Sequence, residues 1–131
     1  MRVLLSNDDG VSSAGLAALR GALSREHEVW VVAPDGERSG CSHAITVSGP
    51  VITREVGERV FACGGMPVDC VNMALAHIMP LPPDVVVSGI NLGANLGTDV
   101  LYSGTAAAAR QAALRGLPSM ALSLVGAPPW R

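Results

Sequence analysis

The sequence contains no lysine, and all nine of its basic residues are arginine. This absence excludes P-loop NTPases, Schiff-base enzymes and protein kinases, because each of these needs a lysine amine at a defined place. Aromatic residues make up only 3% of the chain, which disfavours a nucleic-acid reader that stacks bases on aromatic rings. The core must therefore come from the small and branched apolar residues that dominate the 49% hydrophobic content.

Charge is also sparse and scattered. The formal net charge is −2, with no basic patch and no acidic tail, so we expect no nucleic-acid polymer as a partner. No apolar run approaches the roughly 20 residues of a membrane span, so we expect no membrane partner. The first apolar run stops at Ser6 before two acidic residues, which is not the pattern of a signal peptide.

Cysteine is rare as well. The three cysteines are Cys41, Cys63 and Cys70, an odd number without a CxxC pair. A disulfide framework or a structural zinc site is therefore not expected. Together with the absence of a leader, this favours a cytoplasmic protein.

Strand-like and helix-like segments alternate along the chain, which predicts an α/β fold with a mostly parallel sheet. At 131 residues the chain fits a single domain spanning 1–131. We expect strands at Val3–Ser6, Val29–Ala33, Ile45–Val47, Val51–Val56, Val60–Cys63, Asp84–Ser88 and Ser119–Leu124. Helices are expected at 16–23, 68–79 and 105–115, with a long loop at 89–104. No helical segment follows the last strand, so we expect a chain that is cut or completed by a partner.

Three polar loops directly follow predicted strands, at 7–10, 35–42 and 89–105. If the strands are parallel, these loops meet at one edge of the sheet, where open α/β sheets bind ligands. Asp8 and Asp9 are adjacent carboxylates, which repel each other unless a cation neutralises them. Oxygen ligands favour a hard metal, Mg²⁺ or Mn²⁺. The alternative is that Asp9 caps the next helix while Asp8 is solvated.

The other two loops also contain candidate ligands. Ser39 and Ser42 carry hydroxyl oxygens for a metal or for ordinary turn hydrogen bonds. The loop from Gly89 repeats glycine every fourth residue and contains Asn91 and Asn95, which supply carbonyl oxygens for a metal and amide donors for a phosphate. The alternative is a flexible loop, although loops of this length in compact domains are usually functional. Ser103-Gly104-Thr105 then opens a helix and is either an anion site or a plain N-cap.

Taken together, these motifs resemble the SurE family (survival protein E), the metal-dependent 5′-nucleotidases. The matching segments run in the family's order: Arg2–Gly10 (RVLLSNDDG), Val32–Gly40 (VAPDGERSG), Gly65–Cys70 (GMPVDC), Val87–Gly97 (VSGINLGANLG) and Tyr102–Ala107 (YSGTAA). Met66 stands where the family usually has threonine, a departure that concerns the turn rather than the metal. Family members are also longer, and their further segment builds pocket walls and a subunit-exchanging arm.

The resemblance implies a Rossmann-like three-layer sandwich that hydrolyses nucleoside 5′-monophosphates, with 3′-monophosphates and short polyphosphate as further substrates. It implies one divalent cation per subunit, Mg²⁺ or Mn²⁺, and a homodimer or homotetramer. The metal ligands would be Asp8, Asp9, Ser39 and Asn91; the phosphate-binding residues would be Asn95, Ser103, Gly104 and Thr105; the catalytic residues would be Asp8, Asp9 and Asn95. The alternative is a non-catalytic nucleotide- or metal-binding remnant of such a domain.

Overall fold

The computed structural model describes residues 1–126 of the chain. Within that part, six strands form a sheet in the order β3-β4-β2-β1-β5-β6. The strands are β1 (Arg2–Ser6), β2 (Glu28–Pro34), β3 (Thr53–Gly57), β4 (Val60–Cys63), β5 (Val85–Leu92) and β6 (Ser119–Leu124). The helices are α1 (Ala14–Leu23), α2 (Pro67–Met73), the π-helical segment η1 (Ala74–Ile78), α3 (Asp99–Tyr102) and α4 (Gly104–Leu114).

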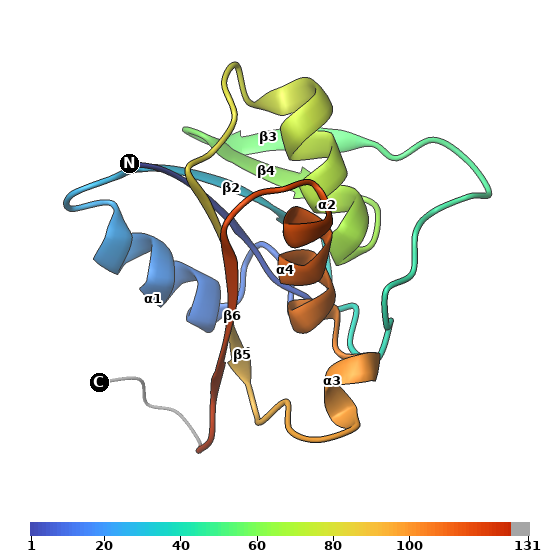
Figure 1. Ribbon diagram of the computed structural model, residues 1–131. Coiled ribbons are helices and arrows are strands. Elements are labelled where there is room, and N and C mark those ends of the chain that lie inside the picture. Colours follow the sequence, from blue (N-terminus) through green and yellow to red (C-terminus); the bar gives the residue numbers. More distant parts are fainter. Residues whose placement is uncertain (127–131) are drawn as a thin grey trace.

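The helices form layers on both sides of the sheet. Helix α1 covers one face, α2 and α4 cover the other, and α3 lies near the carboxyl end of β5, beside the start of α4 (Figure 1). Only β3 runs antiparallel to its neighbour, and the other strand pairs are parallel. The predicted Rossmann-like three-layer sandwich with a mostly parallel sheet is therefore confirmed. None of the helices in residues 1–126 combines the length and apolar character that a membrane span requires.

Strand β1 occupies the point where the strand order reverses. Val3 pairs with Val29 of β2 on one side and with Val85 of β5 on the other. The loops that leave β1 and β5 therefore diverge and open a crevice beyond their carboxyl ends. This position, the topological switch point, is where open α/β sheets bind ligands.

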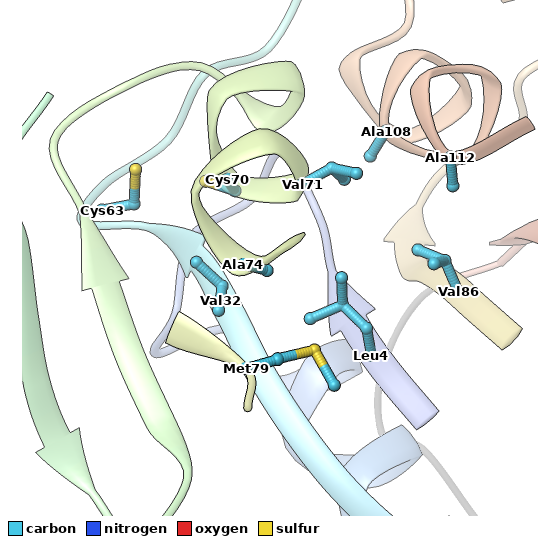
Figure 2. Packing of buried hydrophobic residues seen from close by; sticks show 10 residues of the cluster. All are labelled: Leu4, Val32, Cys63, Cys70, Val71, Ala74, Met79, Val86, Ala108 and Ala112. Atoms are coloured by element: carbon cyan, nitrogen blue, oxygen red, sulfur yellow. The ribbon is translucent and has the colours of Figure 1, made fainter. Parts of the chain in front are cut away.

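Two hydrophobic cores hold the layers together, because alternate residues of β1 point to opposite faces of the sheet. Leu4 faces α2 and α4, where it packs in one cluster with Val71 and Ala108 (Figure 2). Val3 and Leu5 face α1 and belong to the second cluster. Full burial of a Leu or Val side chain stabilises the fold by about 1.5–3 kcal/mol, so the position of β1, and of the loop after it, is strongly fixed.

The α1 face also carries an apolar hollow of about 450 Å³. It lies between α1 and the β5–β6 end of the sheet, and nearly all of its lining is apolar. The residues around it include Leu19, Leu23, Val85, Met120 and Leu122. Because it lacks a cluster of polar groups, this hollow has no means of binding a phosphate.

Three sequence-based predictions need correction. Ile45–Val47 is not a strand, because the backbone N–H and hydroxyl of Thr46 bond instead to the carboxylate of Asp69. The helix predicted at 68–79 changes at Ala74 into a π-helical turn, which the N–H of Met79 closes onto the carbonyl of Ala74 at 2.9 Å.

The predicted end of the chain, and the limit of the single domain at residue 131, lie outside the described residues.

The long loop predicted at 89–104 is the third correction. Strand β5 continues to Leu92 because Asn91 and Leu92 pair with Ser123 and Leu124 of β6. The short helix α3 occupies the end of the same segment. The irregular part is thus only residues 93–98 and Ser103, and Asn91 lies on a strand rather than in a loop.

Candidate metal and phosphate site

The loop after β1 is shaped by Asn7. The Asn7 side-chain amide donates to the carbonyl of Gly10 at 2.9 Å and to the hydroxyl of Ser13 at 2.7 Å, and its oxygen accepts from the N–H of Gly10 at 3.1 Å. Gly10 has a φ of +108°, a conformation that glycine adopts without strain. Because Asn7 folds the loop back in this way, Asp8 and Asp9 lie at the carboxyl end of the strand.

The N-cap of α1 is Ser13 rather than Asp9. The Ser13 hydroxyl accepts from the N–H of Leu16 at 3.4 Å. The alternative in which Asp9 caps the following helix is therefore wrong. Asp9 instead faces β5, where its carboxylate accepts from the N–H of Leu92 at 3.5 Å.

Asp8 and Asn91 meet at the hydroxyl of Thr105. This hydroxyl donates to Oδ1 of Asp8 at 2.7 Å and lies 3.3 Å from Oδ1 of Asn91. The Asn91 amide nitrogen donates to the carbonyl of Gly93 at 3.0 Å, so the amide oxygen is turned towards Asp8 and Thr105. Oxygen atoms from β1 and β5 therefore converge across the crevice at the switch point.

The loop after β2 adds Ser39 and a third carboxylate. The N–H of Arg38 donates to the carbonyl of Asp8 at 2.7 Å, which fixes this loop against the first one. The Ser39 hydroxyl donates to Glu37 at 2.8 Å, so its oxygen lone pairs remain available to a cation. Burial and then the charge of Asp8 raise the pKa of the neighbouring Cys41 thiol, so Cys41 stays neutral and is a poor metal ligand.

The N-terminus of α4 points into the same region. The Ser103 hydroxyl accepts from the N–H of Ala106 at 3.1 Å, so Ser103 is the N-cap. Gly104 lies so close to the first loop that an added Cβ would be 2.7 Å from Cβ of Asp8. The absence of a side chain at Gly104 therefore lets the positive end of the helix approach the carboxylates, and such helix ends attract anions.

A pocket of about 410 Å³ contains these groups. Its lining is Asp8, Asp9, Glu37, Ser39, Gly40, Asn91, Leu92, Ala94, Asn95, Asp99, Tyr102 and Ser103. Four of these residues are acidic and none is basic. A phosphate dianion would be repelled by such a lining unless a cation lay between them.

The donor set fits a hard divalent cation. Two adjacent carboxylates, a hydroxyl oxygen and an inward-turned amide oxygen are the ligand types that Mg²⁺ and Mn²⁺ prefer. Within residues 1–126, no three or more His, Cys, Asp and Glu side chains converge as a metal-binding group. Mg²⁺ does not need such a group, because it commonly uses one or two carboxylates and keeps several waters.

Asp9 carries the electrostatic signature of this crowding. Burial raises the pKa of its carboxyl above the ordinary value, and the charges of Asp8 and Glu37 add to the rise. The hydrogen bond from Leu92 acts in the opposite direction but does not cancel it. A nearby cation would favour the charged form of Asp9 and so lower its pKa.

Ser42 does not line the pocket, and its N–H donates to the carbonyl of Tyr102 at 2.9 Å. The structure brings the eight residues that the family resemblance implies to one edge of the sheet. Six of them line the pocket, whereas Gly104 and Thr105 lie directly behind Asp8. The hydroxyl of Thr105 is bonded to Asp8, so only the backbone of Thr105 can serve a phosphate. Asn95 lines the pocket while its amide donates to the hydroxyl of Ser123 at 2.7 Å.

Sequence reasoning missed four residues of this region. Asn7, Glu37, Asp99 and Tyr102 shape the first loop or line the pocket. An Asn three residues before a glycine is a recognisable turn signal, so Asn7 could have been found. Nothing in the sequence marks Glu37 or Asp99, since isolated acids in loops are common. Tyr102 lies in a matched motif, but the motif alone indicates no role for its ring.

Several known proteins are similar to this chain. A family model described as "Survival protein SurE" matches residues 3–129. The chain is 50% identical over 125 residues to a protein of Geotalea daltonii named 5′-nucleotidase SurE, covering 95% of this chain and 50% of that protein. It is 54% identical over 129 residues to a protein of the same name from Treponema pallidum, covering 95% and 69% of the two chains.

A solved structure is also similar to this chain. The crystal structure of SurE protein from Aquifex aeolicus superposes with a TM-score of 0.92 at 42% identity, over 96% of this chain and 52% of that one. The chain thus spans about half the length of most of these relatives. Because the family model covers nearly all of the sequence and the fold matches closely, the chain belongs to the Survival protein SurE family.

Proposed function

We propose that this protein is a metal-dependent phosphatase that releases phosphate from nucleoside 5′-monophosphates. The relatives named 5′-nucleotidase SurE support this substrate class. The observation that carries the proposal is the meeting of Asp8 and Asn91 in front of the α4 N-terminus, in a pocket lined by acidic residues and no basic ones. Such a lining suits a phosphate only when a cation is bound with it.

The proposed metal ligands are Asp8, Asp9, Ser39 and Asn91, with one Mg²⁺ or Mn²⁺ per subunit. A divalent cation supplies Lewis acidity that polarises a phosphoryl oxygen and makes a nearby water more acidic. Thr105 holds Asp8 by its 2.7 Å hydrogen bond. Glu37 accepts a hydrogen bond from the Ser39 hydroxyl, which turns the serine lone pairs away from that carboxylate.

The phosphate would lie between the carboxylates and the start of α4. The backbone N–H groups at Gly104 and Thr105, with the Ser103 N-cap before them, would stabilise negative charge on the transferring phosphoryl group. Asn95 would contribute its side-chain amide, which a hydrogen bond to Ser123 holds in place. These positioned dipoles need no reorganisation when charge develops in the transition state.

Water is the nucleophile in this proposal, and Asp9 is the group that orients it and takes its proton. Asp8 is a poor nucleophile, because it is buried and already accepts the Thr105 hydrogen bond. Asp9 is more exposed and lines the pocket, so its carboxylate can reach a water held there. Detection of a phosphorylated Asp8 by mass spectrometry would contradict this assignment.

The test uses the full-length native protein with Mn²⁺ and AMP. We expect Asp8→Asn to lower phosphate release on the order of 100-fold or more, because several kcal/mol of charge stabilisation are lost. Glu55→Gln is the matched control, since it removes a negative charge from β3, an exposed strand at the edge of the sheet. Undiminished turnover in Asp8→Asn would refute the proposal.

Calorimetry with Mn²⁺ and AMP separates catalysis from binding alone. Turnover together with binding supports the enzyme. Binding without phosphate release by the native protein would instead favour the non-catalytic nucleotide- or metal-binding domain.

Three finer proposals accompany the main one. The pocket is open and can admit 3′-monophosphates or a short polyphosphate as well, because phosphate and metal recognition involve no contact to a particular hydroxyl. A homodimer or homotetramer is the proposed assembly. A reducing cytoplasm is the proposed location, supported by Cys41, Cys63 and Cys70 all being free thiols.

A further inference from the structure

Tyr102 has an unusual environment for an aromatic ring in this chain. The other two aromatic residues within residues 1–126 are Trp30 on β2 and Phe61 on β4, and their rings stack with centroids 6.4 Å apart. Tyr102 is 59% exposed and lines the pocket that contains Asp8 and Asp9. Exposure of a large ring at the wall of a polar pocket leaves apolar surface available to a ligand.

The backbone that carries this ring is held in place on both sides. The carbonyl of Tyr102 accepts from the N–H of Ser42 at 2.9 Å, which joins it to the loop after β2. The guanidinium of Arg110 donates to the carbonyl of Val100 at 3.3 Å, which joins α3 to α4. Tyr102 therefore stands on a supported segment, directly before the Ser103 N-cap and the phosphate-binding start of α4.

The pocket lining is chemically mixed. The carboxylates and Ser103 at the start of α4 supply polar surface, whereas Leu92, Ala94 and Tyr102 add apolar surface. Leu92 is 45% exposed, so this apolar surface is accessible. A ligand that suits both kinds of surface has a charged group joined to a flat apolar group, which is the chemistry of a nucleoside monophosphate.

We propose that Tyr102 stacks on the base of the nucleoside monophosphate and gives the site its preference for nucleotides over other phosphate esters. This inference rests on the proposed function, because it needs a nucleotide that is bound in this pocket by its phosphate. Stacking on an aromatic ring tolerates any base, since every base has a π-face. The site is therefore expected to accept purine and pyrimidine nucleotides, with the larger purines bound more tightly.

The test compares AMP with ribose 5-phosphate, which has the same phosphate and sugar but no base. In the full-length native protein with Mn²⁺, we expect Tyr102→Ala to raise KM for AMP about tenfold, as is typical for one lost stacking contact. Its kcat for AMP, and both constants for ribose 5-phosphate, should stay within about twofold of wild type. Competitive inhibition by adenosine should weaken by the same factor as the binding of AMP.

Two variants separate stacking from structural damage. Tyr102→Phe keeps the ring and should behave as wild type with both substrates. Leu101→Ala removes a neighbouring side chain that is 63% exposed and does not line the pocket, and it should also behave as wild type. Sedimentation of each variant should match wild type.

Three results would overturn the inference. An equal loss with AMP and ribose 5-phosphate would make Tyr102 a support of the pocket. An unchanged KM for AMP in Tyr102→Ala would place the base elsewhere, and an altered sedimentation coefficient would make Tyr102 a subunit contact. If the wild-type protein released phosphate from neither substrate, the proposed function itself would fail, and this inference with it.

Discussion

The hydroxyl group of Thr105 donates a 2.7 Å hydrogen bond to Oδ1 of Asp8, a residue 97 positions earlier in the sequence. Both side chains are buried. The bond fixes one carboxylate oxygen of Asp8 and so directs the other towards the pocket. Because this hydrogen bond joins the first turn of α4 to the loop after β1, it also sets the distance between the phosphate-binding and metal-binding parts of the proposed site.

Replacing Thr105 should therefore weaken metal binding, even though Thr105 is not itself a proposed metal ligand. Thr105→Val keeps the shape but removes the donor, and we expect the affinity for Mn²⁺ to fall about 10- to 100-fold, as for other partners of ligand side chains. Thr105→Ser keeps the hydroxyl and should bind Mn²⁺ within about threefold of wild type. Calorimetry measures both. Equal affinity in Thr105→Val and wild type would show that Asp8 needs no such support.

Asp9→Asn should stabilise the metal-free protein while it abolishes metal-dependent activity. The pKa of Asp9 is raised in the folded state, mainly by burial and then by Asp8, so the folded protein holds this proton more tightly than the unfolded chain. Stability is then lost as the pH rises from the ordinary pKa of 3.8 through the raised value. Because Asp9 is partly exposed, the gain in Asp9→Asn is on the order of 0.5 kcal/mol.

The measurement is urea unfolding in the presence of a chelator, at pH values from 3 to 8. The difference in unfolding free energy between Asp9→Asn and wild type should appear above the raised pKa. It should vanish below pH 3.8, where the Asp9 carboxyl is protonated in both the folded and the unfolded state. Glu55→Gln reports the general effect of removing one exposed charge. A wild-type protein more stable than Asp9→Asn at pH 7 without metal would contradict the prediction.

The same substitution at two helical glycines should have opposite effects. A Cβ at Gly104 would lie 2.7 Å from both Cβ of Asp8 and Sγ of Cys41, so Gly104→Ala should destabilise the fold by about 1–3 kcal/mol. A Cβ at Gly21 meets nothing within 4 Å, so Gly21→Ala should stabilise it by about 0.5–1 kcal/mol. Thermal unfolding distinguishes the two. Only Gly104→Ala should also weaken Mn²⁺ binding, because only it displaces Asp8.

Asp69 should be the residue that holds the loop after β2 against α2. Its buried carboxylate accepts from the N–H of Met66 at 2.8 Å, from the N–H of Thr46 at 3.1 Å and from the Thr46 hydroxyl at 2.7 Å. Asp69→Ala leaves these donors without a partner and should cost about 2–3 kcal/mol. Thr46→Val removes only the hydroxyl and should cost about 1 kcal/mol.

Limited proteolysis provides a second readout for these two variants. Asp69→Ala should be cleaved faster than wild type between residues 44 and 52, with Thr46→Val intermediate. Equal cleavage rates in all three proteins would mean that other contacts hold this loop.

Much of the sheet was predictable because its information is local. The apolar runs at β1 and β2 are continuous, and Ser119–Leu124 matches the expected strand at both ends. Strand parallelism then follows from the alternation with helices, and it brings the loops after β1, β2 and β5 together. For this reason the edge that holds Asp8, Ser39 and Asn91 could be named from the sequence.

The remainder depends on contacts between distant segments. Residues 45–47 have strand-forming side chains, but Thr46 bonds to Asp69 instead of to a strand. The extension of β5 to Leu92 requires β6, which lies about thirty residues later. The orientation of Asp8 by Thr105 has no local pattern at all, since a threonine at the start of a helix is usually interpreted as part of a cap.

The apolar hollow between α1 and the β5–β6 end of the sheet affects how the stability of this chain can be followed. An open apolar surface with a volume of about 450 Å³ can bind the fluorescent dyes that report exposed hydrophobic groups in unfolded or molten states. A chain that leaves this apolar face open would therefore bind such a dye and increase its fluorescence while still folded. Circular dichroism provides a signal that does not depend on this surface.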